Sequence, residues 1–123
     1  MIIKESAENY LEAILMIQRK KGYVRSIDIA NELHFTKASV SVAMKHFREE
    51  GYIQIEENGD IVLSEKGLSI ANRVYERHQV IAQALMALGV DEEIAYEDSC
   101  KIEHDISEQT FEKIKEFLTK HQK

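Results

Sequence analysis

One change of hydrophobic period, at residues 52–64, limits the folds open to this chain more than any other feature. The stretch YIQIEENGDIVLS contains two short β-type runs, Tyr52 to Glu56 and Asp60 to Leu63, with Asn58-Gly59 between them. Both residues of this dipeptide can take a positive φ, so the pattern predicts a β-hairpin. The rest of the chain has helical patterns, and no proline interrupts them. A mainly α-helical fold with one two-stranded element is therefore expected.

Three helices are predicted before the hairpin and three after it. Each one either follows a residue that can cap its first turn or ends at a glycine. The expected limits are residues 5–21 ending at Gly22, 27–33 capped by Ser26, Thr36 to about Glu50 ending at Gly51, Ser64 to about Leu88 ending at Gly89 despite Gly67, and two further helices capped by Asp91 and Ser107.

The order of the first elements is that of a winged helix-turn-helix. The helix at 27–33, the LHF turn and the helix that Thr36 begins form the helix-turn-helix, and the hairpin forms the wing. We therefore assign residues 1–64 to a winged-helix DNA-binding domain and residues 65–123 to a second, helical domain. A length of 123 residues suits one domain or two very small ones.

The charge of the chain argues at first against a nucleic-acid partner, because the net charge is −6. Its distribution softens this argument. Residues 1–64 carry eight Lys/Arg and ten Asp/Glu, a net of −2, whereas residues 65–123 carry eight and twelve, a net of −4. The acidic excess lies mostly in the second half, where bound cations would offset it.

The single cysteine and the absence of targeting signals bear on location. One cysteine cannot form an internal disulfide. No apolar run approaches the roughly 20 residues needed to cross a bilayer, and the N-terminus MIIKESAENY lacks the pattern of a signal peptide. The expectation is a cytoplasmic protein with no membrane partner.

The candidate DNA-binding residues cluster in the second helix of the helix-turn-helix, whose N-terminal part enters the major groove in proteins of this type. Small or polar side chains suit the entry, basic ones suit phosphates, and a valine can touch a thymine methyl group. Two further positions, before the first of the two helices and at the wing tip, could hold the DNA backbone. The candidates are Arg25, Thr36, Lys37, Ser39, Ser41, Val42, Lys45, Arg48 and Asn58. The alternatives are a solvated helix face or a winged helix used for protein contact.

A second set of candidates lies in the stretch SCKIEHDIS. Cys100, Glu103 and His104 are spaced i, i+3 and i+4, so on a helix they share one face, and all three are ligands for transition metals. If the helices pack together, Asn9, Glu12 and His78 could join them. Each has a plainer interpretation. The cysteine suits a buried apolar site, the histidine a packed or surface position, the glutamate a surface charge, and the asparagine a position near a helix start.

The whole chain resembles the diphtheria toxin repressor family of metal-dependent regulators, which includes the manganese transport regulators. The resemblance is carried by SAENYLEAIL, GYVRSIDIANEL, ASVSVAMKHFREEGYI, IVLSEKGLSIANRVYERH and LGVDEEIAYEDSCKIEHDIS. It implies a metal-binding and dimerisation domain at residues 65–123 and a homodimer on a palindromic operator in double-stranded DNA. It also implies repression of metal-uptake genes when metal is sufficient. The chain ends before an SH3-like third domain could begin, so it resembles the short, two-domain type.

The resemblance also implies a ligand set, position by position. Glu103, His104 and His78 match family ligands, and Glu12 matches a carboxylate of the manganese-sensing branch. Cys100 falls where the iron-responsive branch has cysteine and the manganese branch has glutamate. Asn9 departs from both branches, which have methionine or aspartate there, because its neutral amide offers one oxygen and no charge. Ala82 and Tyr96 fall where the iron branch has ligands of an ancillary metal site. A second site of that kind is therefore not expected.

This hybrid site indicates Fe(II), with Mn(II) as the close second and Co(II) or Zn(II) as metals that could bind in vitro. A thiolate favours metals softer than Mn(II), and an amide at Asn9 removes a charge that Mn(II) would favour. Cytosolic zinc and cobalt are expected to be scarce. Two other functions stay open. One is a metalloenzyme using a metal-activated water, although no substrate pocket pattern supports it. The other is a winged-helix regulator that senses redox state or a small molecule through Cys100 without metal.

Overall fold

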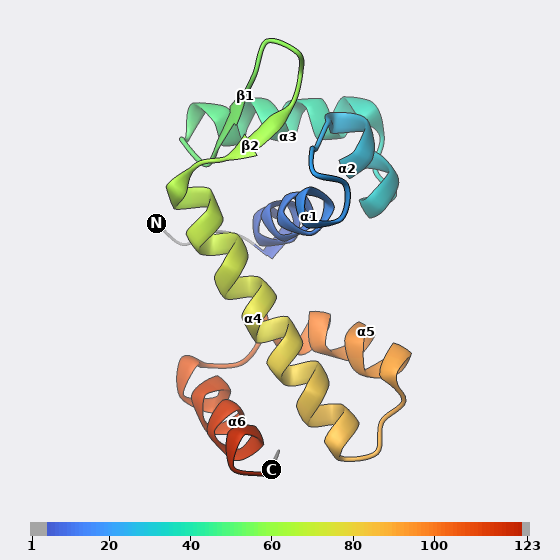
Figure 1. Cartoon of the computed structure of the whole chain (residues 1–123), viewed down its shortest axis with the longest axis vertical. Coiled ribbons are helices and arrows are strands. Elements are labelled where there is room, and N and C mark those ends of the chain that lie inside the picture. Colours follow the sequence, from blue (N-terminus) through green and yellow to red (C-terminus); the bar gives the residue numbers. More distant parts are fainter. Residues whose placement is uncertain (1–4, 122–123) are drawn as a thin grey trace. The chain divides into compact units, whose positions relative to one another are not determined.

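The computed structural model describes residues 5–121, which form six helices and one two-stranded sheet (Figure 1). The chain divides into two compact units, Met1–Asn72 and Arg73–Lys123, and the long helix α4 contributes to both. The mainly α-helical class and the order of elements expected from the sequence are confirmed. None of the helices within residues 5–121 has both the length and the apolar character needed to span a membrane.

The first unit contains α1 (Glu5–Lys21), α2 (Ser26–Leu33), α3 (Lys37–Glu49), β1 (Ile53–Ile55), β2 (Ile61–Leu63) and the start of α4 (Glu65–Ala87). Apolar residues at helical spacing point inward from α1, α2 and α3 and meet the hairpin in one core. The deeply buried members of that core include Leu11, Ile14, Ile29, Val40, Met44 and Ile53. Burial of these faces sets the helix-turn-helix and leaves the outer face of α3 in solvent.

The start of α2 differs from the sequence-based expectation. Ser26 is the first helical residue, and the N-cap is Arg25, whose backbone N–H donates to the Asp28 carboxylate over 3.0 Å. A carboxylate in the first turn compensates the exposed amides better than a serine one residue away, because it also interacts with the positive end of the helix dipole. The expected cap at Ser26 was therefore wrong by one residue.

The turn between α2 and α3 follows the expected pattern. His34 adopts the left-handed conformation with φ of 59°, and the Phe35 N–H donates to the Ala30 carbonyl. Thr36 then caps α3, since its hydroxyl oxygen accepts a hydrogen bond from the Ser39 N–H over 3.1 Å. The Phe35 ring packs 5.5 Å from the Tyr10 ring, which joins the turn to α1.

The hairpin is antiparallel, with Ile53 opposite Leu63 and Ile55 opposite Ile61, and it is shorter than expected. Its turn lies between Glu56 and Asp60, as expected. Gly59 has a φ of 92°, but Asn58 is not left-handed. The Gly59 N–H donates to the Glu56 carbonyl, and the Glu56 N–H donates to the Asp60 carbonyl. This is a loop of three residues, 57–59, as the expected strand ends imply, and it needs one left-handed residue where the Asn-Gly pattern allowed two.

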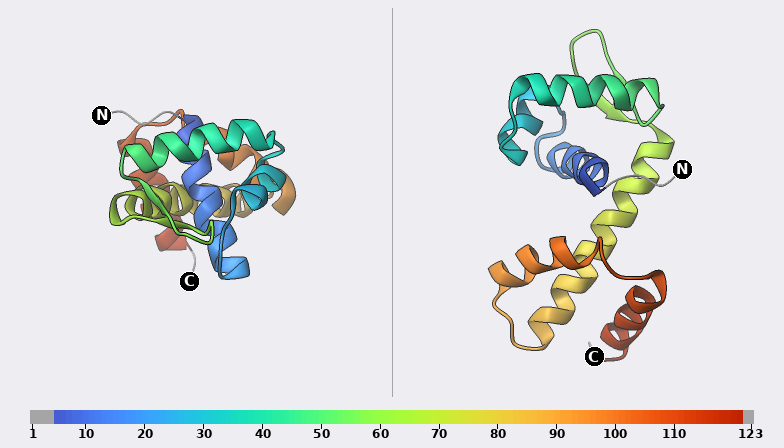
Figure 2. Two further views of the ribbon diagram at one scale, coloured as in Figure 1. Left: turned by 90° about the horizontal axis from the view of Figure 1, so that it is seen from above. Right: turned by 180° about the vertical axis from the view of Figure 1, so that it is seen from behind.

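The second unit combines the C-terminal half of α4 with α5 (Glu92–Ile102) and α6 (Glu108–His121). Within this unit, α5 and α6 lie on either side of α4 (Figure 2). Its core includes Ile81, Ala82, Ala95 and Phe111. The Ser107 hydroxyl caps α6 as expected, accepting from the Thr110 N–H over 3.1 Å. The Asp91 side chain, in contrast, makes no capping hydrogen bond at the N-cap of α5.

Candidate DNA-binding and metal-binding residues

All nine residues predicted to face DNA are exposed: Arg25, Thr36, Lys37, Ser39, Ser41, Val42, Lys45, Arg48 and Asn58. Seven of them lie at the N-cap of α3 or along its outer face. Val42 is 60% exposed, which is unusual for a valine within a helix and suits contact with an apolar surface. The structure thus presents the predicted face to solvent.

The N-terminus of α3 has the electrostatic character of an anion-binding end. Its first turn contains Lys37 and no acidic residue. The amides of a helix N-terminus and its dipole together attract phosphate groups. The basic side chain of Arg48 lies at the opposite end of the same helix. The outer face of α3 can therefore contact phosphates near both of its ends.

Arg25 and Asn58 lie outside α3, and the structure connects them through a residue that sequence reasoning did not select. The Arg25 Nε donates to Asp60 over 3.0 Å, and the Asn58 amide donates to the same carboxylate over 3.2 Å. An acidic residue gave no signal as a DNA-binding candidate on its own. Its position one residue before β2, beside the wing tip, was the only indication in the sequence.

The second unit brings together three of the predicted metal ligands. A ring nitrogen of His78 on α4 and a carboxylate oxygen of Glu103 lie within 4.8 Å of each other. The His104 Nε2 lies 3.5 Å from the Glu103 carboxylate. Side-chain exposure is 1% for Glu103 and 5% for His104. Charge in such a buried position is costly unless opposite charge compensates it, and a divalent cation supplies that compensation.

The orientation of His78 favours coordination through one particular nitrogen. Its Nε2 lies 3.1 Å from the Tyr96 backbone carbonyl, which can only accept a hydrogen bond. Nε2 therefore carries the proton, and Nδ1 carries the lone pair that can coordinate a metal. A hydrogen bond of this kind on the far nitrogen is the usual way a protein orients a metal-binding imidazole. The donor set of imidazole and carboxylate fits a divalent transition metal.

Helix α5 does not continue through the whole predicted ligand motif. It ends at Ile102, and Glu103 is its C-cap with helical φ and ψ, so His104 lies beyond the helix. The helix that was expected to carry Cys100, Glu103 and His104 therefore ends before His104. The Cys100 side chain lies within α5, is half-buried and forms no disulfide.

The two remaining candidates lie on α1, in the first unit. Glu12 is 8% exposed, which is low for a glutamate, and Asn9 is half-buried one turn earlier. These two residues belong to a different compact unit from His78, Glu103 and His104. A buried carboxylate at Glu12 excludes the plainer interpretation of a surface charge.

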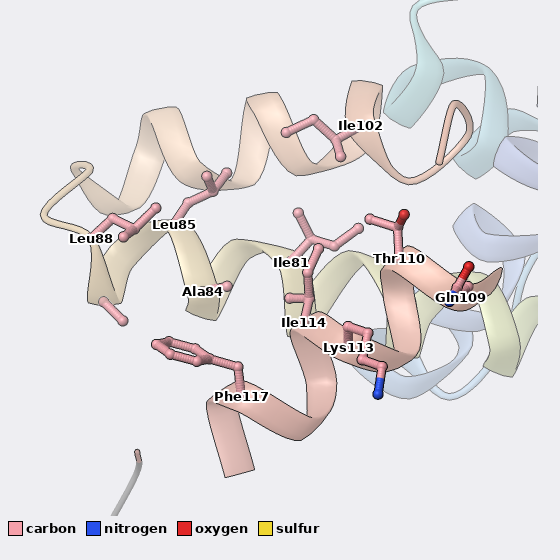
Figure 3. Close-up of a pocket in the computed structure, with 11 residues that line it drawn as sticks. Ile81, Ala84, Leu85, Leu88, Ile102, Gln109, Thr110, Lys113, Ile114 and Phe117 are labelled. Atoms are coloured by element: carbon pink, nitrogen blue, oxygen red, sulfur yellow. The ribbon is translucent and has the colours of Figure 1, made fainter. Parts of the chain in front are cut away.

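A cleft of about 760 Å³ opens on the second unit between α4 and α6, with Ile102 of α5 at one side (Figure 3). Its lining is mostly apolar, as in Ile81, Leu85 and Ile114. At its rim, Leu88 is 78% exposed and Phe117 is 53% exposed. Large apolar side chains gathered at this level of exposure are typical of a surface that another molecule covers.

The fold and the site define the class of this protein, which is a metal-dependent DNA-binding transcriptional regulator. It combines a winged helix whose α3 is exposed with a helical unit that contains a buried imidazole–carboxylate cluster. More particularly, the chain belongs to the iron-dependent repressor family. The profile described as "Iron dependent repressor, N-terminal DNA binding domain" matches residues 3–61. The profile described as "Iron dependent repressor, metal binding and dimerisation domain" matches residues 64–123. Members of this family are repressors, not enzymes.

Individual relatives agree with this assignment. The chain is 37% identical over 109 residues to the "HTH-type transcriptional regulator MntR" of Bacillus subtilis, covering 89% of this chain and 77% of that protein. It is 32% identical to an uncharacterized HTH-type transcriptional regulator of Methanocaldococcus jannaschii, covering 96% of both. Among solved structures, T. acidophilum IdeR matches with a TM-score of 0.82 and 26% identity over 97% of this chain. The chain spans 55% of that IdeR chain.

Proposed function

We propose that this protein represses metal-uptake genes when a divalent metal occupies a site built on His78, Glu103 and His104. The observation that carries the proposal is the buried cluster of these side chains in the second unit. Cys100 and Glu12 complete the site, and Asn9 is its weakest member. The assignment of residues 1–64 to DNA binding and 65–123 to metal binding and dimerisation is part of the proposal. A cytoplasmic location belongs to it too, because the operator DNA would lie there.

The proposed physiological metal is Fe(II), with Mn(II) second. Thiolate and imidazole donors favour metals later and softer than Mn(II), and Cys100 supplies the thiolate. Asn9 offers a neutral amide oxygen, which adds nothing to the negative charge that Mn(II) favours. Co(II) and Zn(II) match the same donors and should act in vitro.

The proposed mechanism links the metal to DNA through the relative position of two recognition helices. The candidate ligands come from α1 on one side and from α4, α5 and the residues directly after α5 on the other. A metal that holds both groups fixes the DNA-binding unit relative to the dimerisation unit. Two copies of α3 can then meet successive major grooves of a palindromic operator, one DNA turn apart. Metal shifts this equilibrium only by its differential affinity for the DNA-binding geometry.

Dimerisation is proposed to cover the apolar cleft between α4 and α6. Support comes from the exposed Leu88 and Phe117 and from the family profile, which describes this segment as a dimerisation domain. Burial of these side chains against a second copy would remove apolar surface that is otherwise in contact with water.

The first experiment measures binding to operator DNA by anaerobic fluorescence anisotropy. The DNA comes from upstream of a metal-transporter gene, and titrations are run in chelator and then separately with Fe(II), Mn(II), Co(II) and Zn(II). We expect affinity to rise at least tenfold with Fe(II), by about 1.4 kcal/mol or more. Tight binding in chelator that no metal changes would reject the proposed switch.

Three substitutions separate the metal mechanism from sensing through the thiol alone. Glu103→Gln keeps the shape of the side chain but removes its charge, and it should abolish the metal-dependent gain in affinity. Glu97→Gln makes the same chemical change at an exposed position of α5 and should have no effect. If Cys100→Ser abolishes the response while Glu103→Gln retains it, the protein senses redox state or a small molecule instead of metal.

A further inference from the structure

A small hydrogen-bonded network joins the wing to the chain before α2. Asp60 is its centre: one carboxylate oxygen accepts from Arg25 Nε over 3.0 Å, and the other accepts from the Asn58 amide over 3.2 Å. The Asp60 backbone N–H in turn donates to the Asn58 side-chain oxygen over 3.0 Å. The next residue, Ile61, donates its N–H to the Val24 carbonyl over 2.7 Å. Two adjacent residues of the wing therefore hold the segment that carries Arg25.

The geometry at Arg25 determines which of its donors face solvent. Nε is engaged by Asp60, and the remaining N–H groups belong to the two terminal nitrogens of the planar guanidinium. The Arg25 side chain is half exposed, whereas the Asp60 side chain is 26% exposed. A guanidinium held by one edge is pre-organised to donate two parallel hydrogen bonds to one phosphate. Less side-chain entropy is then lost when the phosphate binds.

The surroundings make a depression of a size that a phosphate could enter. A surface cavity of about 590 Å³ is lined by Arg25, Asp60, Lys21, Tyr23, Ile27 and Asp28. Lys21 has its own acidic partner, since its Nζ lies 2.6 Å from Asp28. Each basic side chain of this cavity is thus held by one carboxylate.

We infer that Asp60 is a positioning residue for DNA binding, which holds the Arg25 guanidinium ready for a backbone phosphate beside the wing. The inference rests on the proposed function and adds to it Asp60, a residue with the same negative charge as the DNA backbone. An acidic side chain near DNA repels the backbone, so simple electrostatics makes its removal favourable. The network leads to the opposite expectation: removal of Asp60 weakens DNA binding, because the Arg25 guanidinium then loses its fixed orientation.

The test measures operator affinity of the full chain with its activating metal at several salt concentrations. Asp60→Ala should weaken binding about fivefold, as expected for losing the typical net contribution of one hydrogen bond. The slope of log K against log salt should fall by about one phosphate contact, close to 0.9. Asp60→Asn keeps an oxygen that can accept from Nε and should recover most of the affinity. Glu57→Ala removes the same charge from an exposed hairpin residue and should leave binding unchanged or slightly tighter.

A double-mutant cycle with Arg25→Ala gives the second readout. Arg25→Ala should lower the salt slope by the same amount, and adding Asp60→Ala should weaken binding no further. The inference is overturned if Asp60→Ala binds as tightly as the unsubstituted protein, or if the two substitutions add. Circular dichroism checks folding. If Asp60→Ala does not fold, Arg25→Lys takes its place, because lysine keeps the positive charge but lacks the planar guanidinium that donates two parallel hydrogen bonds. Full operator affinity in Arg25→Lys also overturns the inference. An unsubstituted protein that never binds DNA with metal refutes the proposed function itself.

Discussion

At Gly67 the local packing has room for the hydrogen atom of glycine but not for the methyl group of alanine. A Cβ at this position, in the first turn of α4, would overlap the backbone carbonyl oxygen of Tyr52. That carbonyl belongs to the peptide before β1 and accepts from the Ser64 N–H. Backbone cannot move aside as a flexible side chain can. Glycine in a helix is unfavourable by itself, so close packing explains its presence here.

We predict that Gly67→Ala lowers the free energy of unfolding by roughly 1–3 kcal/mol, because the added methyl group overpacks the junction of hairpin and helix. By intrinsic helix propensity alone, the same substitution would stabilise the helix by about 1 kcal/mol. Urea denaturation followed by circular dichroism distinguishes the two signs. Ser69→Ala, at an exposed position of the same helix, serves as the control and should be neutral or slightly stabilising. A stabilised Gly67→Ala variant would contradict the clash.

At the scale of elements, the N-terminus of α2 depends on an ion pair. Lys21 at the end of α1 reaches Asp28 over 2.6 Å, and the Asp28 carboxylate also accepts from the Arg25 N–H. The hydrogen bond from Lys21 is the largest cause of the lowered pKa of Asp28, and the backbone N–H adds to it against the effect of burial. The same bond raises the pKa of Lys21. This pair therefore joins the end of α1 to the first turn of α2.

The pH dependence follows from these directions. Asp28 has a pKa below its ordinary 3.8, so its contribution is present above about pH 4 and is lost as the pH falls through the lowered value. Lys21 has a pKa above 10.5, so its contribution is present below that value and is lost at higher pH. We expect Asp28→Asn to be less stable than the unsubstituted protein by a constant amount between about pH 5 and pH 9.

Urea denaturation across pH measures this difference, which should shrink in acid as the native carboxylate becomes protonated. Asp105→Asn is the control, because it changes an exposed aspartate away from α2. A stability gap between Asp28→Asn and the unsubstituted protein that persists unchanged at the lowest pH at which both fold would show that the ionised carboxylate is not its source.

At the scale of the whole molecule, metal binding should appear as added stability. A ligand that binds only the folded state stabilises it by about 2.7 kcal/mol at a free concentration one hundred times its Kd. We therefore expect the melting temperature of the unsubstituted protein to rise with Fe(II) or Mn(II). Glu103→Gln should show little or no rise, and Glu97→Gln should respond normally. Differential scanning calorimetry under anaerobic conditions provides the measurement. An equal metal-induced rise in Glu103→Gln would exclude that carboxylate as a ligand.

Dimerisation gives the second prediction at this scale. Leu88→Glu places a charge at the most exposed apolar side chain beside the α4–α6 cleft, and it should shift the protein from dimer to monomer. Burial of an unpaired charge in an apolar interface costs far more than the lost apolar contact. Sedimentation velocity reports the two species. Val62→Glu, at an exposed valine of the wing, should remain dimeric. A dimeric Leu88→Glu variant would place the interface elsewhere.

Local signals in the amino-acid sequence were sufficient for the element order, the winged helix-turn-helix, and the caps at Thr36, Ser64 and Ser107. These features depend on neighbours within three or four residues, so hydrophobic period and capping chemistry predict them. The approximate ends of the helices follow for the same reason, because glycines such as Gly51 and Gly89 take the positive φ values expected of them.

Tertiary packing alone decided the remaining features. The N-cap of α2 lies one residue earlier than expected because Asp28 is anchored by Lys21 from another helix. The hairpin turn includes contacts between Asn58 and Asp60, and only one of its residues is left-handed. The pairing of Asp60 with Arg25 joins residues 35 positions apart, a separation at which periodicity carries no information. The approach of His78 to Glu103 depends in the same way on how α4 and α5 pack. Side chains that meet only after helices pack leave no spacing in the sequence that a local rule can detect.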